Sequence, residues 1–329
     1  SPAKGVAALL AHCPKHAPTP LVDHPGLAHA AGVAALYIKD ERGRMGLGSF
    51  KALGAAYKIA RDAAARGGPQ DGKADLSKAL AGETYVTASA GNHGLSVAAG
   101  ARLFGAQAII YLANSVPEAF AQRLRGIGAE VTRAGAIYEE AMDTAAADAA
   151  REGWSLLSDS TWEGYVSPAL AVMEGYMQLA AEAVAQLQAP PSHVLLQAGV
   201  GGLAAGVAAH LRHAWGDAPE IWVVEPEAAP ALHASIAAGK PVTTQGPVSA
   251  MGRLDCKTPS LVALAHLSRD ADRFVTLSEA EAQAGTDLAA SHDLASTPSG
   301  AAGLAALLAG LDGMPKQARV MVILSEGPE

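Results

Sequence analysis

Lys51 is the residue in this sequence that is best suited to covalent chemistry. It lies in the segment Gly-Ser-Phe-Lys-Ala-Leu-Gly, residues 48–54, where the pattern predicts the start of a helix. A lysine amine can form an imine with an aldehyde, provided that neighbouring groups lower its pKa so that the free amine is available. We therefore expect Lys51 to be a nucleophile with a lowered pKa, and a solvated lysine on a helix surface is the alternative.

Two further segments carry backbone groups that suit anions. Residues 89–94 read Ser-Ala-Gly-Asn-His-Gly, and residues 198–203 read Ala-Gly-Val-Gly-Gly-Leu. The second segment follows an apolar run at 194–197 and precedes a helical pattern at 203–209, so it predicts a strand, a glycine turn and a helix start. Free N–H groups and the helix dipole favour a phosphate dianion there. A tight turn that only permits close packing is the alternative.

An imine-forming lysine and a phosphate site in one chain indicate pyridoxal 5′-phosphate. The order and spacing of these segments resemble the fold-type II pyridoxal-phosphate enzymes, the superfamily of the tryptophan synthase β-subunit and the serine/threonine dehydratases. The resemblance extends along nearly the whole chain and includes a last strand that ends Leu-Ser-Glu-Gly at 324–327. Residues 159–165, 174–176 and 197–203 most resemble the diaminopropionate ammonia-lyases.

Composition narrows the class of partner. The formal net charge is −8 and no basic run of five residues occurs, which argues against nucleic acid and anionic membranes. No stretch of about eighteen apolar residues occurs, and residues 1–4 lack a signal-peptide pattern. The two cysteines, Cys13 and Cys256, are too few for a disulfide framework. We therefore expect a cytoplasmic protein that binds a small metabolite, and the resemblance implies that this metabolite is an amino acid.

Short aliphatic runs alternate with longer helical stretches, a pattern typical of an α/β fold with largely parallel sheets covered on both faces. Amphipathic helices are expected over 117–126 and 137–152, and the polar segment 66–73 is expected to be a surface loop between two helices. Strands are expected near 35–38, 85–87, 108–111, 130–131, 193–196, 221–224, 274–275 and 320–324.

The resemblance implies two domains, each a mostly parallel, twisted sheet with helices on both faces. Residues 1–51 and 158–329 would form the large cofactor-binding domain, and residues 52–157 would form a small domain that closes over the substrate. The cofactor would lie in the cleft between them. The resemblance also implies a homodimer.

The resemblance assigns roles at the cofactor. Lys51 would hold it and then act as the general base that removes the α-proton of an amino acid. Asn92 would bind the phenolic oxygen, Ser325 would face the pyridine nitrogen, and Phe50 would also contact the cofactor. A serine that only caps the strand end is the alternative for Ser325. The phosphate loop would comprise Gly199, Val200, Gly201, Gly202 and Leu203.

The substrate carboxylate would lie on the loop that contains Ser89, Ala90, Gly91 and His93. Diaminopropionate lyases carry an aspartate at the position of Ala90, so this chain lacks a second base and should act weakly on the D-isomer. His93 could shuttle protons, although packing beneath the ring is the favoured alternative. Asp159 could hold the β-ammonium group of a diamino acid, and a turn or N-cap aspartate is the alternative.

These assignments predict a lyase that converts 2,3-diaminopropionate to pyruvate and ammonia. Residues 297–303, Thr-Pro-Ser-Gly-Ala-Ala-Gly, resemble a segment of the dehydratases. A serine, threonine or 3-hydroxy-amino-acid dehydratase is therefore the alternative function. A non-catalytic cofactor- or amino-acid-binding paralogue is the alternative from another class. No metal site is expected, because His210 and His213 have no third ligand nearby and a solvated helix face is favoured. Cys256 is expected either to line the site or to pack in the core.

Overall fold

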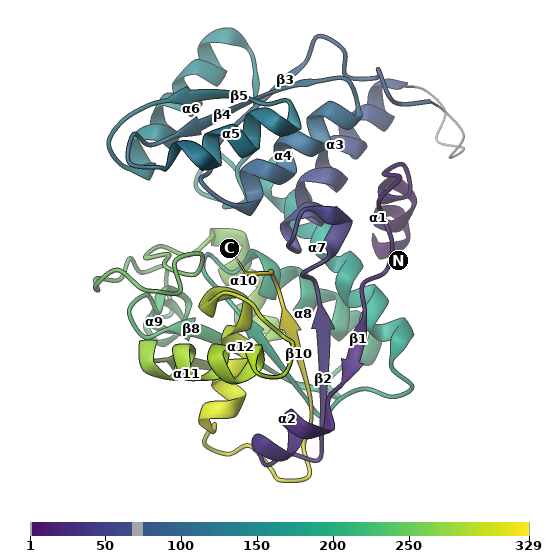
Figure 1. Cartoon of the computed structure of the whole chain (residues 1–329), viewed down its shortest axis with the longest axis vertical. Coiled ribbons are helices and arrows are strands. Elements are labelled where there is room, and N and C mark those ends of the chain that lie inside the picture. The colour runs from purple at the N-terminus through teal and green to yellow at the C-terminus, as the bar shows by residue number, and fades with distance from the viewer. Residues whose placement is uncertain (1, 68–74, 329) are drawn as a thin grey trace.

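The computed structural model describes residues 2–67 and 75–328, which form two sheets with their own helices (Figure 1). The six-stranded sheet draws its strands from both ends of the chain, and the four-stranded sheet draws its strands from a continuous central segment. The strand order of the first is β1 (Leu21–Asp23), β2 (Ala35–Asp40), β10 (Arg319–Leu324), β7 (His193–Gln197), β8 (Glu220–Pro226) and β9 (Arg273–Leu277). The strand order of the second is β5 (Glu130–Arg133), β4 (Gln107–Leu112), β3 (Thr84–Ala88) and β6 (Ser155–Leu156).

The strand pairing confirms the predicted parallel sheets. Within the two sheets of the described chain, β1 alone runs antiparallel to its neighbour, β2. Every strand expected from the sequence is present, whereas β1 and β6 were not predicted. Parallel strands require long crossover connections, and helices supply them between most successive strands.

The helices cover both faces of each sheet. Around the four-stranded sheet lie α3 (Lys51–Gly67), α4 (Asn92–Leu103), α5 (Glu118–Ile127) and α6 (Tyr138–Glu152). Around the six-stranded sheet lie α2 (Pro25–Ala30), α7 (Ser167–Gln186), α8 (Gly202–Trp215), α9 (Ala231–Ala238), α10 (Leu261–Asp270), α11 (Glu279–Ala290) and α12 (Pro298–Ala309). Near the N-terminus, α1 (Pro2–Leu10) packs on α7 and α3, and the short 3-10 helix η1 (Arg44–Gly46) precedes α3.

The buried side chains follow the alternation that two covered faces require. Val194 and Leu196 of β7 point to the cluster under α7 and α8, whereas Leu195 points to the cluster under α11 and α12. In the four-stranded sheet, Ile110 of β4 packs toward α3 and α4, whereas Ile109 packs toward the alanines of α6. The expected α/β arrangement with both faces covered is therefore confirmed.

Two smaller expectations have mixed outcomes. Helices α5 and α6 confirm the predictions over 117–126 and 137–152. Arg66 and Gly67 of the expected loop belong to the end of α3, and its remaining residues, 68–73, lie outside the described residues. None of the helices described combines the length and apolar character that a membrane span needs.

Close helix packing brings the start of α3 against α7. A Cβ atom at Gly54 would lie 2.6 Å from the Tyr176 ring, and one at Gly175 would lie 2.6 Å from the Leu53 carbonyl oxygen. Only glycine permits this approach, because any side chain would overlap the facing helix. The contact fixes the position of Lys51, the first residue of α3.

A buried ion network anchors the segment that leads into α3. Arg44 donates to Glu41 at 2.7 Å and to Glu182 of α7 at 2.7 Å, and Lys39 of β2 donates to Glu182 at 2.8 Å. All four side chains are at most 5% exposed. Each buried charge has an opposite partner, which is the condition under which burial of charge is tolerated.

Candidate active site

Lys51 forms an ion pair with Asp159, which follows β6 in the chain. Both side chains are about a fifth exposed, at 23% and 22%. The Lys51 ammonium also lies 5.2 Å from the centre of the Phe50 ring and 5.9 Å from that of Tyr176. The predicted lysine and the predicted aspartate therefore lie together, against an aromatic wall.

The expected lowering of the Lys51 pKa is wrong in this arrangement. Burial acts to lower the pKa of Lys51, but the adjacent Asp159 carboxylate outweighs burial and raises it. The same pairing holds the pKa of Asp159 well below its usual range, even though burial alone would raise it. The lysine is therefore held as an ammonium group for as long as Asp159 is its partner.

The loop at 89–94 connects β3 to the N-terminus of α4. Gly91 has an extended backbone and is the N-cap of the helix, so the first N–H groups of α4 face the loop. The N–H of Gly91 donates to the Ser89 hydroxyl at 3.3 Å, whereas Ala90 is exposed. This turn places Asn92 at the first helical residue.

His93 is buried beneath this loop. Its Nε2 lies 2.8 Å from the carbonyl oxygen of Leu157, so Nε2 carries the proton and donates. Burial lowers the pKa of His93, which favours the neutral ring. Its Nδ1 has no partner among the residues that the structure describes. This geometry matches the packed histidine favoured from the sequence.

The glycine segment turns from β7 into α8 as predicted. Gly201 caps α8 with a φ of 100°, a left-handed conformation that suits glycine. A Cβ atom at Gly199 would lie 3.0 Å from the Cys256 sulfur, and one at Gly202 would lie 3.7 Å from the Asp159 carbonyl oxygen. The start of α8 therefore lies next to the segment that carries Asp159.

Ser325 immediately follows β10 and is 5% exposed. Its N–H donates to the Gly300 carbonyl at 3.0 Å, and its own carbonyl accepts from the Phe50 N–H at 3.0 Å. Ser325 therefore lies beside the residue that precedes Lys51. The backbone of the last strand and that of the lysine segment are joined here.

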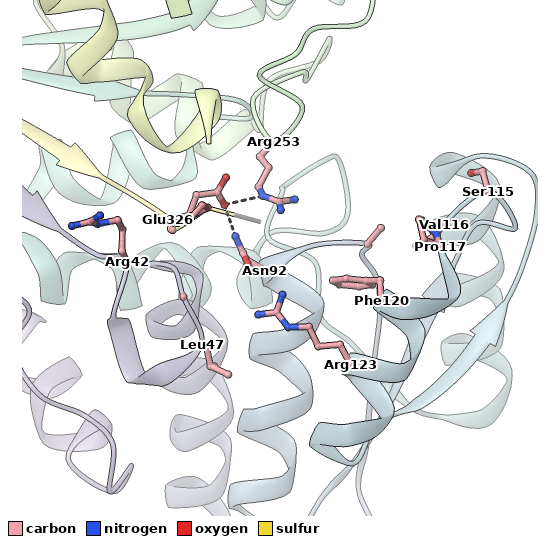
Figure 2. Close-up of a pocket in the computed structure, with 14 residues that line it drawn as sticks. Arg42, Leu47, Asn92, Ser115, Val116, Pro117, Phe120, Arg123, Arg253 and Glu326 are labelled. Atoms are coloured by element: carbon pink, nitrogen blue, oxygen red, sulfur yellow. Dashed lines mark hydrogen bonds and ion pairs between the residues drawn. The ribbon is translucent and has the colours of Figure 1, made fainter. Parts of the chain in front are cut away.

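Glu326 is a buried carboxylate that sequence reasoning did not identify. It is 4% exposed, and the amide of Asn92 donates to it. Arg253 pairs with the same oxygen at 2.8 Å, and the Thr297 hydroxyl donates to the other. Figure 2 shows Asn92 and Arg253 converging on Glu326. The only available signal was an acidic residue directly after Ser325.

A cavity of about 710 Å³ opens beside Glu326. Ala90 lines it from the loop that precedes α4. Asn92, the first residue of α4, and Phe120 and Arg123 of α5 also line it (Figure 2). Lys51 and the glycine segment are not part of its lining. It therefore adjoins the Lys51 site on the side of Asn92 and Glu326.

Tyr176 and Cys256 complete the surroundings of Lys51. Tyr176 is 1% exposed, its hydroxyl has no partner within the described chain, and burial raises its pKa. Burial also raises the pKa of Cys256 to about 11. Its sulfur would lie 3.0 Å from a Cβ atom at Gly199, so Cys256 lies beside the glycine turn, and its raised pKa makes it a poor nucleophile.

The histidine pair on α8 differs from expectation in one respect. His213 is exposed, but His210 is 8% exposed and therefore belongs to the protein interior. Across residues 2–67 and 75–328, no three His, Cys, Asp or Glu side chains are arranged to hold a metal ion.

Comparison with known proteins identifies the family. The sequence pattern of the pyridoxal-phosphate dependent enzymes matches residues 13–326. The chain belongs to this family. The enzyme is 31% identical to the diaminopropionate ammonia-lyase of Salmonella typhimurium over 84% of this chain and 72% of that protein. It is 32% identical to human serine dehydratase-like protein over 76% of this chain and 69% of that protein.

A solved structure agrees with both the fold and the family. The Escherichia coli diaminopropionate ammonia lyase, in complex with an aminoacrylate-PLP azomethine reaction intermediate, superposes with a TM-score of 0.89 at 30% identity. The match covers 99% of this chain and 88% of that one. The predicted family, its two-sheet α/β fold and its pyridoxal-phosphate cofactor are confirmed.

The residues present fit pyridoxal phosphate. The start of α8 offers free N–H groups in a turn that a Cβ at Gly199 or Gly201 would crowd, which suits a phosphate. Lys51 offers an amine that could react with the aldehyde, and its partner Asp159 lies on the segment beside that turn. The buried Tyr176 hydroxyl offers a polar contact near the amine.

Proposed function

We propose that this enzyme eliminates the β-amino group of 2,3-diaminopropionate and releases pyruvate and two molecules of ammonia with the uptake of one water. The ion pair between Lys51 and Asp159 carries this proposal. Because the Asp159 carboxylate lies next to the reactive amine, it is placed to bind the β-ammonium group of the substrate, close to the bond that breaks. When bound, pyridoxal phosphate supplies the electron sink for the charge that remains at Cα.

Asp159 would exchange one cation for another during the reaction. Its carboxylate is the main cause that raises the Lys51 pKa, whereas burial acts to lower it. Once a substrate ammonium replaces Lys51 as the partner of Asp159, burial dominates and the Lys51 pKa falls. Lys51 can then accept the α-proton as a neutral amine. The diamino substrate would thereby activate its own base.

The remaining site residues have matching proposed roles. Asn92, Ser325 and Phe50 would contact the cofactor ring, and the segment from Gly199 to Leu203 would hold its phosphate. The substrate carboxylate would lie on Ser89, Ala90, Gly91 and His93, where the first N–H groups of α4 face the loop.

We also propose the division into a small domain, residues 52–157, and a large domain, residues 1–51 and 158–329. The separate sheets support this division, since β3 to β6 lie within the first and all other strands lie within the second. A cytoplasmic homodimer is proposed from the family resemblance and from the two unpaired cysteines. Light scattering of the purified protein would test the dimer.

A hydroxy-amino-acid dehydratase is the second candidate. Ala90 is neutral, and Thr297 caps α12 in the segment that resembles the dehydratases. The similarity to human serine dehydratase-like protein adds support. The two candidates differ in the β-leaving group, which is an amine in one and a hydroxyl in the other.

A substrate panel tests the proposal. Ammonia and 2-keto acid release would be measured with L- and D-2,3-diaminopropionate, L-serine, L-threonine and 3-hydroxyaspartate, with Lys51→Ala as the control. Release from L-diaminopropionate well above the hydroxy amino acids, lost in Lys51→Ala, is the expected result. Preference for a hydroxy amino acid would place the enzyme with the dehydratases. If none of these substrates releases ammonia or a 2-keto acid while the cofactor is bound, both the ammonia-lyase and the dehydratase would be rejected, and a non-catalytic binding paralogue would be favoured.

A further inference from the structure

The Glu326 carboxylate joins three separate parts of the chain at the edge of the cavity. Figure 2 shows two of these contacts, those with Asn92 and Arg253. One of its oxygens accepts from Asn92, at the start of α4, and from Arg253, in the connection between α9 and α10. The other accepts from Thr297, the N-cap of α12. Asn92 belongs to the elements around the four-stranded sheet, and the other two belong to the six-stranded sheet. Glu326 therefore links the two groups of elements through one buried charge.

The backbone holds this carboxylate in place. The carbonyl of Glu326 accepts from the Ser296 hydroxyl at 2.6 Å, and Glu326 forms an isolated antiparallel bridge with Ser49. The next N–H, that of Gly327, donates to the Gly48 carbonyl at 3.0 Å. Because Glu326 is anchored on both sides, it is the fixed member of the contact with Asn92, and the amide must adapt to it.

We propose that Glu326 is a positioning residue that orients the Asn92 amide for cofactor binding. A carboxylate accepts hydrogen bonds only, whereas an asparagine amide has one face that donates and one that accepts. The contact therefore turns the NH₂ group of Asn92 toward Glu326 and leaves its second N–H to donate to the cofactor. This inference rests on the proposed function, in which Asn92 binds the phenolic oxygen.

Arg253 supports the same arrangement. Its guanidinium pairs with Glu326, and its Nη1 lies 3.0 Å from the position that a Cβ atom at Gly91 would occupy. The Arg253 cation thus balances the Glu326 charge and lies against the loop that carries Asn92. The ion pair with Arg253 offsets the cost of burying the Glu326 carboxylate, whose oxygens accept from the NH₂ face of the amide.

The test uses Glu326→Gln, which keeps the size but offers both a donor and an acceptor to Asn92. Protein from which the cofactor has been removed would be titrated with pyridoxal phosphate. Both the Kd and the absorption maximum of the bound cofactor would be measured. We expect the Kd to rise about tenfold, as for the loss of a charge-assisted hydrogen bond, together with a shifted absorption maximum. Glu227→Gln, an exposed carboxylate with the same change in charge, serves as the control.

A double-mutant cycle separates positioning from general stability. If Glu326 acts through Asn92, Glu326→Gln should have little further effect on the Kd in an Asn92→Ala background. Additive losses, or an unchanged Kd and spectrum in folded Glu326→Gln, would overturn the proposal. Circular dichroism would check folding, and Glu326→Asp would enter the same cycle if the glutamine variant does not fold. These readouts do not need turnover, so they remain valid if the substrate panel fails.

Discussion

The Lys51 ammonium and the Asp159 carboxylate are direct partners although 108 residues separate them in the chain. The pair joins the first turn of α3 to the segment after β6, and it sets the protonation state of both groups. The amine that we propose as the nucleophile is thus held as a cation by a carboxylate. Removal or neutralisation of Asp159 should change both cofactor attachment and turnover, in opposite directions.

Asp159→Asn should speed cofactor attachment and slow turnover of a diamino substrate. Without the carboxylate, burial remains and the Lys51 pKa falls, so more free amine is present at pH 7 to 8. We expect attachment, followed by absorbance, to accelerate about tenfold, and kcat/KM for L-diaminopropionate to fall about a hundredfold. The value for L-serine should fall less. Equal losses for both substrates would contradict a role of Asp159 at the β-ammonium group.

Gly201→Ala should weaken cofactor binding through backbone strain in the glycine turn. The φ of 100° is unfavourable for alanine by about 1 to 2 kcal/mol, and the added methyl would lie 3.0 Å from the Ala263 Cβ atom. We expect about a tenfold higher Kd for pyridoxal phosphate. Gly239→Ala is the matched control, because its φ of 65° is also left-handed but the space around it is open. A similar loss of affinity in both variants would argue against a phosphate loop at Gly201.

The sequence predicted the succession of long strands and helices along the chain well, because each of these elements has its own periodic pattern. Strands β1 and β6 escaped prediction, since three and two residues are too few to show an alternation. Both are recognisable only through their neighbours, β2 and β3.

Sequence motifs were enough to propose candidate site residues, but they could not predict features that depend on tertiary contacts. Lys51, Asn92 and the glycine turn lie in recognisable segments. The sign of the Lys51 pKa shift was predicted wrongly, because it depends on Asp159, which no local pattern connects to the lysine. Glu326 was missed for the same reason, since its three partners come from distant elements.

Glu182→Gln should strongly destabilise the protein by breaking the buried ion network before α3. Lys39 and Arg44 would both lose a partner while remaining buried, at a cost of about 3 to 5 kcal/mol. Urea unfolding measures this cost. Glu174→Gln on the same helix is the control, because its pair with Arg61 is about a third exposed on both sides and should contribute less than about 1 kcal/mol.

The same network predicts acid sensitivity. Burial acts to raise the pKa of Glu182, but Arg44 and Lys39 outweigh burial and lower the pKa from 4.5 to about 2. A lowered folded-state pKa stabilises the protein above the unfolded value, and this contribution is lost as the pH falls through the folded value. The free energy of unfolding should therefore drop between pH 4.5 and pH 2. A Glu182→Gln variant should lose this part of the pH dependence, and an unchanged acid profile would contradict it.

Cys256 should react slowly with alkylating reagents despite its position beside the glycine turn. Burial, followed by the negative charge of Asp159, raises the pKa of the thiol from 9.0 to about 11, and only the thiolate reacts. At pH 8 the thiolate fraction should be about a hundredfold below that of an unperturbed cysteine, and the rate should climb about tenfold per pH unit until the pH approaches the pKa. Iodoacetamide labelling of Cys13→Ser, in which Cys256 is the one remaining thiol, measures this rate. In an Asp159→Asn background the thiol should react faster, because the negative charge that raises its pKa most after burial is gone. A fast reaction at pH 8 in the Cys13→Ser protein would show that the thiol is activated.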